Sequence, residues 1–461
     1  MYTGITKNSK EVKPGYIYCC FEGRQVSGYE FIEEALKNGA VKIIGEKNLQ
    51  IKYYEQVDNI NQAMINYSKE IYHFPDKKLK LIGITGTDGK TSTALIIDYL
   101  LNQKSQSSYL GTNGFFIKQE EVEYSGFTTP FADKLYSYFA QSVNQDSKYF
   151  VMEVSSHALQ QKRVLGLNYQ VGIFNNLSAE HLDFHRTMED YYQAKKQLFE
   201  QLAPNGYAII NIDDEYGKRL KSEINNKILT ISNKNQDADY YFTNESLALT
   251  NSTFDLFIHK QKYQIVSPLL AKFNIYNLVQ AIATVQCLGY NLEDINDTIK
   301  NLVIPGRLES VPNNQNLNII IDFAHTADAI NKVMEFIKNK QQQGKIHVLT
   351  GSAGQRDQEK RPLMGEYAAK YADFLYLTED DPRDEAVKSI ITDLKKGVKN
   401  KQCQIIEEEN RQKAISNMIQ NAKPLDTLIL FGKGSMKVMY YNNYTEKYIE
   451  KEVVQSVLKG E

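Results

Sequence analysis

Two glycines, a lysine and a threonine stand together between an apolar run and a helical pattern. The run Leu79–Thr85 (LKLIGIT) has the composition of a buried strand, and the turn Gly86–Thr91 (GTDGKT) follows it directly. The next residues, TSTALIIDYLL, place apolar side chains at helical spacing. A strand, a glycine turn and a helix start in that order form a cradle of backbone N–H groups for a phosphate. We expect Lys90 to contact β- and γ-phosphates and Thr91 to bind Mg²⁺.

The match to the standard phosphate-loop pattern is incomplete. In G-x-x-x-x-G-K-[ST] the first glycine stands five residues before the second, and Ile84 occupies that position here. An ordinary glycine turn between strand and helix is the alternative interpretation. The Lys-Thr pair after the second glycine, together with the flanking elements, favours phosphate binding.

Glutamate, histidine and lysine side chains in the following segments are considered for a metal site near such a loop. Glu153 ends the apolar run KYFVMEV, and ligand sites form where parallel strands end, so it fits a Mg²⁺ ligand beside Thr91; a solvated strand-end glutamate is the alternative. His181 and His185 are four residues apart, but no H-E-x-x-H pattern and no third ligand support zinc, and a surface position is the alternative for His185. Lys195 lies on a helix that heads into the core, and a lysine whose amine merely reaches back to water is the alternative.

Polar residues also follow the predicted strands of the second half. Asp322 lies at the end of the strand-like run NIIIDF, and His325 follows just after it. The stretch GSAGQRDQEKRPLMGE carries Arg356, Asp357, Lys360 and Arg361 after a glycine turn, which suits an anion. DDPRDE (380–385) repeats the arrangement after the next strand, and PGRLE places Arg307 at a boundary. FNIYN (273–277) offers an aromatic ring and two amides for a purine, or simply a helix start.

Length and charge limit the class of protein. The chain has 461 residues, which suggests about three domains, and 54 basic against 56 acidic residues give a net charge of −2. This balance argues against nucleic-acid or membrane binding through bulk charge. No apolar run approaches the ~18 residues that span a bilayer, and the N-terminus lacks a signal-peptide core. The four cysteines have no C-x-x-C spacing, so we expect a reduced cytoplasmic enzyme. Separately, we expect a monomer that binds small-molecule substrates.

The order of strand-like and helix-like segments predicts an α/β protein. Residues 1–78 read as a small α/β unit, with strands at PGYIYCCF and VKIIGE and a linker at Pro75–Lys80. Residues 79–304 alternate strands and helices, which indicates a mostly parallel sheet, with short strand-like runs between Asp237 and Pro268. From Pro305 the alternation restarts, so residues 305–461 read as a second doubly wound domain.

Read together, these segments resemble the Mur ligases, and most closely the MurE type. TGTDGKT, FTTP, MEVSSHAL, NLSAEHLDFH, AKKQLF, PGRLE, DFAHTADAI and GQRDQEKRPLMGE occur in the family order over nearly the whole chain. The resemblance implies three domains: an N-terminal UDP-sugar-binding domain, a central P-loop ATPase domain, and a C-terminal Rossmann-like domain that brings the incoming amino acid. It also implies an ATP- and Mg²⁺-dependent ligase, which adds an amino acid to the D-Glu of UDP-MurNAc-L-Ala-D-Glu through an acyl phosphate.

The resemblance assigns roles by matching positions. Glu153 and His181 match Mg²⁺ ligands beside Thr91, and Lys195 matches a lysine that the family carries as an N-carboxylated side chain. The residues expected around ATP are Gly86, Thr87, Asp88, Gly89, Lys90, Thr91, Ser92, Asn274, Asn277, Arg307, Asp322 and His325. Those expected at the UDP-MurNAc dipeptide are Ser9, Arg24, Gln25, Val26, Thr128, Thr129, Ser155, Gln161 and Arg163. Those expected at the incoming amino acid are Arg356, Asp380, Asp381, Pro382, Arg383 and Gly432.

Two departures concern the incoming amino acid. Family members that add meso-diaminopimelate share a D-N-P-R stretch, whereas this chain has Asp380-Asp381-Pro382-Arg383. They also share G-K-G-H-E, whereas Gly432-Lys433-Gly434 continues here with Ser435-Met436. Arg383 could bind a carboxylate on the side chain of the incoming amino acid, whereas the Asp381 carboxylate would attract an ammonium group. We therefore favour L-lysine over diaminopimelate or another diamino acid. The alternatives are another ligase of the superfamily, such as a folylpolyglutamate synthase-like enzyme or a different Mur step, and a non-catalytic P-loop nucleotide-binding paralogue.

Overall fold

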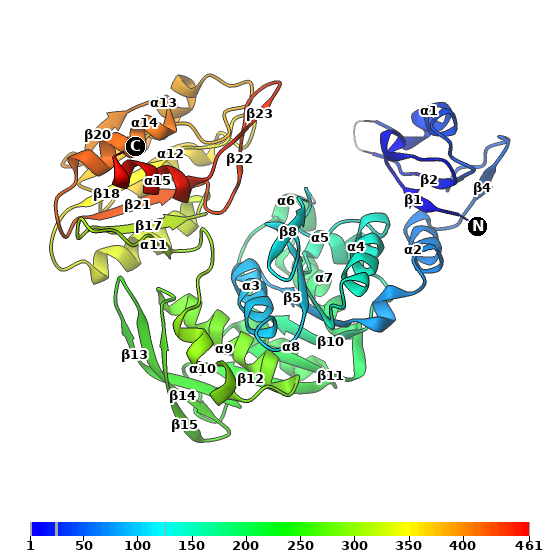
Figure 1. Ribbon diagram of the computed structural model, residues 1–461, viewed down its shortest axis with the longest axis horizontal. Coiled ribbons are helices and arrows are strands. Elements are labelled where there is room, and N and C mark those ends of the chain that lie inside the picture. The colour runs from blue at the N-terminus through cyan, green and yellow to red at the C-terminus, as the bar shows by residue number, and fades with distance from the viewer. Residues whose placement is uncertain (1, 24–25, 125, 461) are drawn as a thin grey trace. The chain divides into compact units, whose positions relative to one another are not determined.

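The computed structural model describes residues 2–23, 26–124 and 126–460 (Figure 1). Contacts between Cα atoms divide them into two compact units. The first holds residues 1–243, 255–264 and 276–298, and the second holds 244–254, 265–275 and 299–461. The domain boundaries predicted at 78/79 and 304/305 stay predictions.

The N-terminal part of the first unit is a four-stranded parallel sheet in the order β1-β2-β3-β4. Its strands are β1 Gly4–Thr6, β2 Tyr16–Cys20, β3 Lys42–Gly45 and β4 Tyr54–Gln56, and its helices are α1 Ile32–Lys37 and α2 Ile60–Ile71. Asn59 caps α2 by accepting a hydrogen bond from the Gln62 N–H. The strands expected at PGYIYCCF and VKIIGE are confirmed, and the expected linker forms a short 3₁₀-helix, Pro75–Lys78.

An eleven-stranded sheet follows, in the order β15-β14-β13-β12-β11-β10-β5-β9-β6-β7-β8. β5 (Lys80–Thr85) lies at its middle, parallel to β9 (Tyr149–Glu153) on one side and to β10 (Tyr169–Phe174) on the other. Ile84 pairs with Glu153, and Thr85 pairs with Phe174, so the three strands end at the same edge. Glu153 therefore lies beside the turn that follows β5.

The remaining strands of this sheet are β6 Ser107–Gly111, β7 Gly114–Ile117, β8 Glu120–Glu123, β11 Leu202–Asn211, β12 Lys227–Ser232, β13 Tyr240–Leu247, β14 Ser252–Ile258 and β15 Gln261–Ser267. The helices in this stretch of the chain are α3 Lys90–Leu101, α4 Ala132–Asn144, α5 Ser156–Gln160, α6 Leu182–His185, α7 Met188–Glu200, α8 Glu215–Glu223, α9 Lys272–Cys287 and α10 Leu292–Lys300. One apolar cluster joins the N-terminal sheet to the larger one, since it contains Ile17, Met64, Leu81 and Phe150.

The C-terminal part has a six-stranded sheet in the order β16-β17-β21-β18-β19-β20, parallel except where β16 meets β17. Its strands are β16 Glu309–Ser310, β17 Asn318–Asp322, β18 Ile346–Thr350, β19 Phe374–Leu377, β20 Gln404–Glu407 and β21 Thr427–Phe431. Its helices are α11 Ala327–Lys340, α12 Lys360–Ala369, α13 Val387–Lys396, α14 Arg411–Asn421 and α15 Glu450–Lys459. A hairpin, β22 Val438–Tyr440 and β23 Thr445–Lys447, follows the last strand. The predicted α/β alternation is confirmed.

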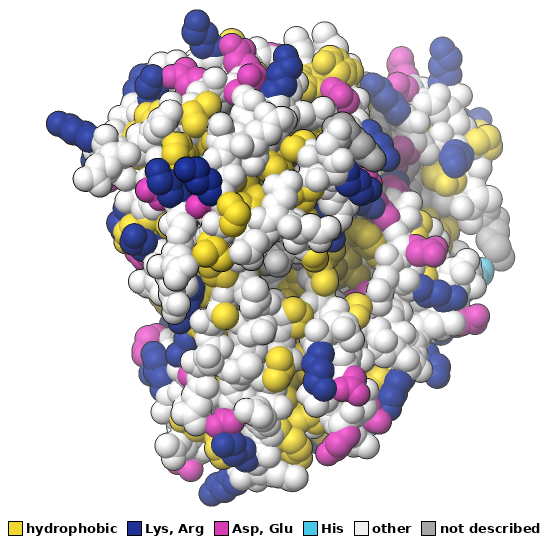
Figure 2. All heavy atoms as spheres, turned by 60° about the vertical axis from the view of Figure 1, so that its left-hand side comes forward, with side chains coloured by type: hydrophobic (Ala, Val, Ile, Leu, Met, Phe, Trp, Pro, Cys, Tyr) yellow, Lys and Arg dark blue, Asp and Glu magenta, His cyan; other side chains and the backbone are white. Residues whose placement is uncertain are grey.

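The charges on the surface and the hydropathy of the helices agree with the expectations from the sequence. On the face shown in Figure 2, basic and acidic side chains are interspersed, as the net charge of −2 indicates. Within the described residues, no helix is both long and apolar enough to cross a membrane.

Candidate active site

The turn after β5 has the geometry of a phosphate loop. α3 starts at Lys90, and Gly89 at its N-cap has φ 82°, in the left-handed region. A Cβ atom at Gly89 would lie 2.5 Å from Asn277 Oδ1 and 2.7 Å from Asn175 Nδ2, so the space as well as the backbone requires glycine. The predicted strand, turn and helix are therefore all present, although Ile84 replaces the usual first glycine.

Two lysines converge on one carbonyl oxygen of this loop. Lys90 Nζ donates to Gly86 O (2.9 Å) and Thr87 O (2.8 Å), and Lys195 Nζ donates to the same Gly86 O at 2.7 Å. Lys195 is 1% exposed, so the alternative in which its amine reaches water is wrong. Burial, and secondly the charge of Lys90, lower the pKa of Lys195 well below its usual value.

Glu153 is fully buried at the end of β9 and accepts four hydrogen bonds. Its Oε1 accepts from Tyr109 OH (2.7 Å) and the Thr112 N–H (2.9 Å). Its Oε2 accepts from Thr91 Oγ1 (3.0 Å) and Thr112 Oγ1 (3.2 Å). The alternative of a solvated glutamate is therefore wrong, and the carboxylate is held against the hydroxyl expected to bind Mg²⁺.

Other loop residues tie the loop to its neighbours. Thr87 Oγ1 accepts from the Ser178 N–H (3.0 Å), and the Asp88 N–H donates to Asn176 Oδ1 (2.9 Å). Asn277 Oδ1 accepts from Thr93 Oγ1 (3.2 Å), which places its side chain against α3, and Ser92 is buried in the same helix. Asn274 instead donates from Nδ2 to Leu270 O (2.9 Å) at the start of α9, the local role that its position near a helix start suggested.

Five of the residues expected at the UDP-MurNAc dipeptide form one connected group beside Glu153. Thr129 Oγ1 donates to Glu153 O (2.8 Å) and accepts from the Ser155 N–H (3.1 Å). Arg163 Nη1 donates to Thr129 O (2.8 Å), while its Nε and Nη2 donate to Gln161 Oε1 (2.9 and 2.6 Å). Thr128 Oγ1 lies 3.2 Å from Thr112 Oγ1, which itself bonds Glu153.

Three histidines gather near this group. His181, exposed at the N-cap of α6 with φ 57°, has its ring 5.0 Å from that of His157. His185 is buried, with Nε2 2.9 Å from Ser156 Oγ, so the alternative of a surface position is wrong. Among the described residues no group of three or more His, Cys, Asp or Glu side chains is arranged to hold a metal. The protein groups that fit Mg²⁺ are the Glu153 carboxylate and the Thr91 hydroxyl, both hard oxygen donors.

In the C-terminal part, the residues expected around ATP surround Phe323. The Arg307 guanidinium lies 4.5 Å from the centre of the Phe323 ring, and His325 Nδ1 lies 3.0 Å from Phe323 O. The buried Asp322 accepts from the N–H groups of Leu308 (2.7 Å) and Ala324 (2.8 Å). Burial raises the pKa of Asp322, and the charge of Arg307 opposes this.

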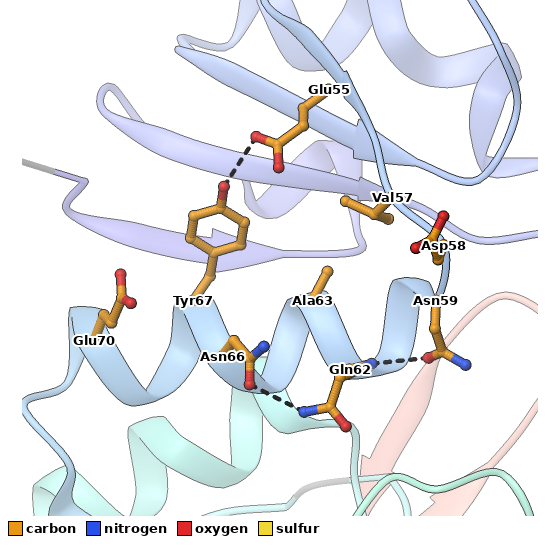
Figure 3. Close-up of a pocket in the computed structure, with 9 residues that line it drawn as sticks. All are labelled: Glu55, Val57, Asp58, Asn59, Gln62, Ala63, Asn66, Tyr67 and Glu70. Carbon is orange, nitrogen blue, oxygen red and sulfur yellow. Dashed lines mark hydrogen bonds between the residues drawn. The ribbon is translucent and has the colours of Figure 1, made fainter.

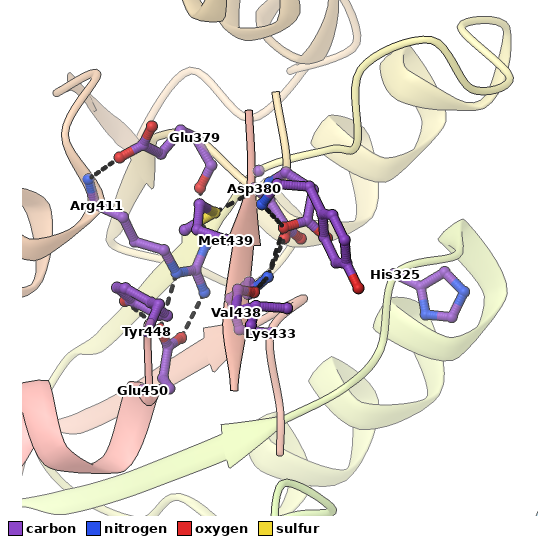
Figure 4. Close-up of polar contacts among 12 residues, drawn as sticks. His325, Glu379, Asp380, Arg411, Lys433, Val438, Met439, Tyr448 and Glu450 are labelled. Carbon is purple, nitrogen blue, oxygen red and sulfur yellow. Dashed lines mark hydrogen bonds and ion pairs between the residues drawn. The ribbon is translucent and has the colours of Figure 1, made fainter. Parts of the chain in front are cut away.

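The DDPR turn is bound to the hairpin that follows β21 (Figure 4). Asp381 Oδ1 accepts from Lys433 Nζ (2.6 Å) and from the Tyr440 N–H (3.0 Å). Lys433 Nζ also donates to Val438 O (2.7 Å), and the Lys433 side chain is 1% exposed. Asp381 and Arg383 have φ 49° and 52°, and Arg383 Nη1 donates to Gly354 O (2.8 Å). The turn is thus held in a strained conformation by bonds from two sides.

A buried charge network lies behind this turn (Figure 4). Asp380 Oδ1 lies 3.9 Å from Lys433 Nζ. The buried Arg411 donates from Nε to Glu450 Oε2 (2.9 Å). Burial raises the pKa of Asp380 to about 6, although Lys433 and Arg411 oppose this. A Cβ atom at Gly432 would lie 2.1 Å from Asp380 Oδ2, so glycine is required there. Pro382 is buried in the same turn.

The basic residues after β18 have separate environments. Arg356 is exposed, as an anion-binding residue requires. Arg361 is buried and forms ion pairs with Glu385 and with Asp393 (3.1 Å), so it does not belong to an anion site. Lys360 Nζ donates to His325 O (3.2 Å), which brings the start of α12 beside the segment after β17.

The N-terminal part contains a cavity of about 650 Å³. Ser9 and Val26, for which binding of the UDP-MurNAc dipeptide stays a prediction, line it together with Lys7, Phe127 and Phe131. Arg24 and Gln25, also predicted there, lie outside the described residues. A second cavity of about 490 Å³, along α2, is lined by Glu55, Tyr67, Glu70 and neighbouring residues (Figure 3), and none of the predicted site residues lines it.

Sequence reasoning missed three residues that the fold brings to the site. Tyr109 and Thr112 bond Glu153 from the end of β6 and the turn after it, and Lys433 pairs with Asp381 from 52 residues away. Tyr109 and Thr112 belong to a strand and a turn that the pattern did not predict. Lys433 belongs to the G-K-G motif, and that motif could have identified it as a site residue.

Models of one family match most of the chain. The Mur ligase family catalytic domain matches residues 1–82, the Mur ligase middle domain residues 84–285, and the Mur ligase glutamate ligase domain residues 306–434. Two similar proteins are the UDP-N-acetylmuramoyl-L-alanyl-D-glutamate–2,6-diaminopimelate ligases of Caldanaerobacter subterraneus subsp. tengcongensis and Aquifex aeolicus. Each is 35% identical, and each alignment covers 99% of this chain and 94% of the relative.

The fold agrees with these matches. A solved structure of a UDP-N-acetylmuramoyl-L-alanyl-D-glutamate–2,6-diaminopimelate ligase superposes with a TM-score of 0.71 at 29% identity, covering 100% of this chain and 95% of the other. The phosphate loop, the buried Glu153 and the three matched domains thus occur in one chain, which belongs to the Mur ligase family, as an ATP-dependent ligase of the MurE type.

Proposed function

We propose that the protein joins an amino acid to the D-Glu side-chain carboxylate of UDP-MurNAc-L-Ala-D-Glu, in the synthesis of peptidoglycan precursors. The observation that carries the proposal is the arrangement of Lys90, Lys195, Thr91 and Glu153 around one phosphate loop. The printed names of the relatives support the choice of substrate. Because ATP and nucleotide-linked precursors are intracellular, we infer a cytoplasmic enzyme.

The chemistry requires activation, since a carboxylate does not react with an amine at neutral pH. ATP converts the D-Glu carboxylate to an acyl phosphate, the amine attacks its carbonyl carbon, and phosphate leaves as the amide forms. Lys90, at the loop, neutralises charge that develops on the transferred phosphoryl group. The group of Thr129, Ser155 and Arg163 would hold the dipeptide next to Glu153, where the carboxylate must meet the γ-phosphate.

Thr91 and Glu153 would hold Mg²⁺, with His181 as a further ligand. When bound, the ion neutralises phosphate charge and orients the γ-phosphate. The carboxylate and the hydroxyl are already 3.0 Å apart and need no rearrangement of the strands to share one ion. His181, exposed at the start of α6, would have to turn toward them.

We propose further that Lys195 is N-carboxylated in the working enzyme. An amine attacks CO₂ only in its neutral form, and burial beside Lys90 lowers the pKa of Lys195 toward that form. The product is a carbamate, so the side chain changes from a cation to an anion. Two cations that share the Gly86 carbonyl would then become an ion pair at the phosphate loop.

For the incoming amino acid we propose 2,6-diaminopimelate. Arg383 suits its distal carboxylate, and the relatives are named for it. The argument for lysine loses force, because Lys433 already balances the charge of Asp381. An incoming ammonium would meet a neutral pair there, and not a free carboxylate.

The test is phosphate release from ATP in the presence of UDP-MurNAc-L-Ala-D-Glu, with diaminopimelate, lysine or ornithine as the amine. We expect release that depends on both substrates and is fastest with diaminopimelate. An Asp381→Asn variant is the matched control, since an amide oxygen still accepts from Lys433 and Tyr440, and it should keep the same preference. If phosphate release is faster with lysine, and this preference is lost in the Asp381→Asn variant, then Asp381 binds the ammonium group of the incoming amino acid. No release with any amine would overturn the proposed function.

A further inference from the structure

Two loops of the second unit contact each other at one edge of its sheet. β18 and β19 are parallel neighbours, so the loop after β18 and the turn after β19 begin side by side. The Gly354 N–H donates to Asp381 O (3.0 Å), and Arg383 Nη1 donates to Gly354 O (2.8 Å). A Cβ atom at Gly354 would lie 1.9 Å from Pro382 O, so only glycine allows this approach. The two loops are therefore joined directly through their backbones.

The carboxylate of Glu385 joins the same two loops a second time. Glu385 follows the DDPR turn, and its side chain is 16% exposed. Its Oε2 accepts from the Gln355 N–H (3.1 Å), and its two oxygens accept from Arg361 Nη1 and Nη2 (2.5 and 2.8 Å). Arg361 Nη2 also donates to Ala353 O (3.2 Å), in the loop after β18. Because both nitrogens meet both oxygens, the pair fixes orientation as well as distance.

These bonds act on strained backbone at two arginines. Gln355, directly before Arg356, has φ 54°, and Arg383 itself has φ 52°. Left-handed conformations of such residues cost free energy and persist only where the surrounding structure holds them. Gln355 is held by its bond to Glu385, and Arg383 by its bond to Gly354. The positions of Arg356 and Arg383 relative to each other thus depend on the bonds between the loops.

The charges of these two arginines are not balanced by acids of the chain. Within the part of the chain that the structure describes, neither Arg356 nor Arg383 has a carboxylate within ion-pair distance. Arg361, by contrast, is fully buried and pairs with both Glu385 and Asp393. Two guanidinium groups without acidic partners, held at a set spacing, suit a ligand that carries two separate carboxylates.

We infer that Glu385, acting through Arg361 and the loop after β18, is a positioning residue that sets the spacing of Arg356 and Arg383. It thereby favours an incoming amino acid with a carboxylate at each end. The inference rests on the proposed function, which supplies diaminopimelate as that amino acid. Lysine has one carboxylate, so it engages one of the two arginines and does not depend on their spacing.

The test compares the wild-type enzyme with Glu385→Ala. Phosphate release from ATP gives kcat and KM for diaminopimelate, and kcat/KM for lysine. We expect the KM for diaminopimelate to rise at least about tenfold with kcat little changed, because a small displacement of one arginine weakens a two-point contact. We expect kcat/KM for lysine to change less than about twofold, so the preference for diaminopimelate falls.

A second variant and a matched control accompany this comparison. Glu385→Gln keeps the size of the side chain and one acceptor for Arg361, so it should raise the KM for diaminopimelate only part of the way. It retains the packing of the site, and the test therefore does not depend on the stability of Glu385→Ala. In the control, Glu366→Ala, the lost carboxylate pairs with Lys399 (2.8 Å) on α12. It should change neither KM nor the preference.

The outcomes separate positioning from a general structural role. An equal loss of kcat/KM with diaminopimelate and with lysine would assign Glu385 to the stability of the unit and overturn the inference. An unchanged KM for diaminopimelate, in variants with the wild-type melting temperature, would also overturn it, while the proposed function would stand. A wild-type enzyme that releases no phosphate with either amine would instead overturn the proposed function, and the inference would fall with it.

Discussion

Glu153 shows how single residues prepare this site. A buried carboxylate is costly unless its oxygens are bonded, and here each oxygen accepts two hydrogen bonds. The donors come from β6, the turn after it and α3, so three elements must be in place before the carboxylate is stable. Its position is therefore determined by the fold before any ligand arrives.

At the same scale, Lys195 gives a prediction. Lys195→Ala should lower kcat by at least about a hundredfold, the usual effect of removing a group that positions or stabilises transferring charge. Acetate or another short carboxylic acid should restore part of the rate by replacing the carbamate. Steady-state phosphate release with and without the acid measures this. Undiminished activity of the variant would contradict the role of Lys195.

Some residues of the site could be predicted from the sequence and some could not. Gly86–Thr91 and Glu153 were predictable because each follows an apolar strand, and strand ends are visible in composition. The Asp381–Lys433 pair was not, because two residues 52 positions apart carry no pattern that brings them together. The burial of His185 depends likewise on Ser156, which belongs to another segment of the chain.

At the scale of elements, α3 carries a buried acid behind the phosphate loop. Asp98 is 3% exposed, and burial raises its pKa to about 7. Its ordinary pKa is about 3.9. Between these values the folded protein keeps a proton that the unfolded chain has lost, so the free energy of unfolding falls as the pH rises.

Asp98→Asn should therefore stabilise the protein increasingly as the pH rises. The advantage should grow by about 2 kcal/mol between pH 5.5 and 7 and change little from pH 7.5 to 8.5, since Asn has no charge to bury. Thermal unfolding of both proteins at these pH values measures it. A difference in stability that does not vary with pH would contradict the assignment.

The strands of the sheet's interior and the short strands between Asp237 and Pro268 were predictable, whereas the edge hairpin of β7 and β8 was not. β5, β9 and β10 are apolar runs buried on both faces, which is the sequence signature of a parallel sheet. β8 has the sequence EEVE, with three glutamates, which are depleted in strands, and Lys118 and Gln119 provide the left-handed turn before it without glycine. Such a strand forms because its neighbour β7 pairs with it, and only the fold supplies that neighbour.

At the scale of the molecule, the second unit includes segments from far upstream of residue 299. Residues 244–254 and 265–275 belong to it, and Leu270, fully buried, packs in one apolar cluster with Ile320, Val348 and Phe431. The core of that unit is thus completed by a residue that precedes the predicted boundary at 304/305.

Leu270→Ala should consequently destabilise the second unit. A buried leucine truncated to alanine costs about 2–5 kcal/mol, because it loses transfer free energy and leaves a cavity. The control, Leu363→Ala, truncates a leucine of α12 that is 44% exposed and should cost less than about 0.5 kcal/mol. Urea unfolding followed by circular dichroism compares the two, and equal effects would contradict this role of Leu270.

The division of the chain between the two units also restricts how genes of this family can recombine. The polypeptide passes from one unit to the other at 243/244, 254/255, 264/265, 275/276 and 298/299. A single crossover at 304/305 would give a hybrid whose second unit takes residues 244–254 and 265–275 from one parent and the remainder from the other. Such a hybrid would have a core with mismatched side chains at Leu270. A crossover upstream of residue 244 would instead divide the first unit, which includes residues 255–264 and 276–298, so functional chimaeras should require parents whose core residues match.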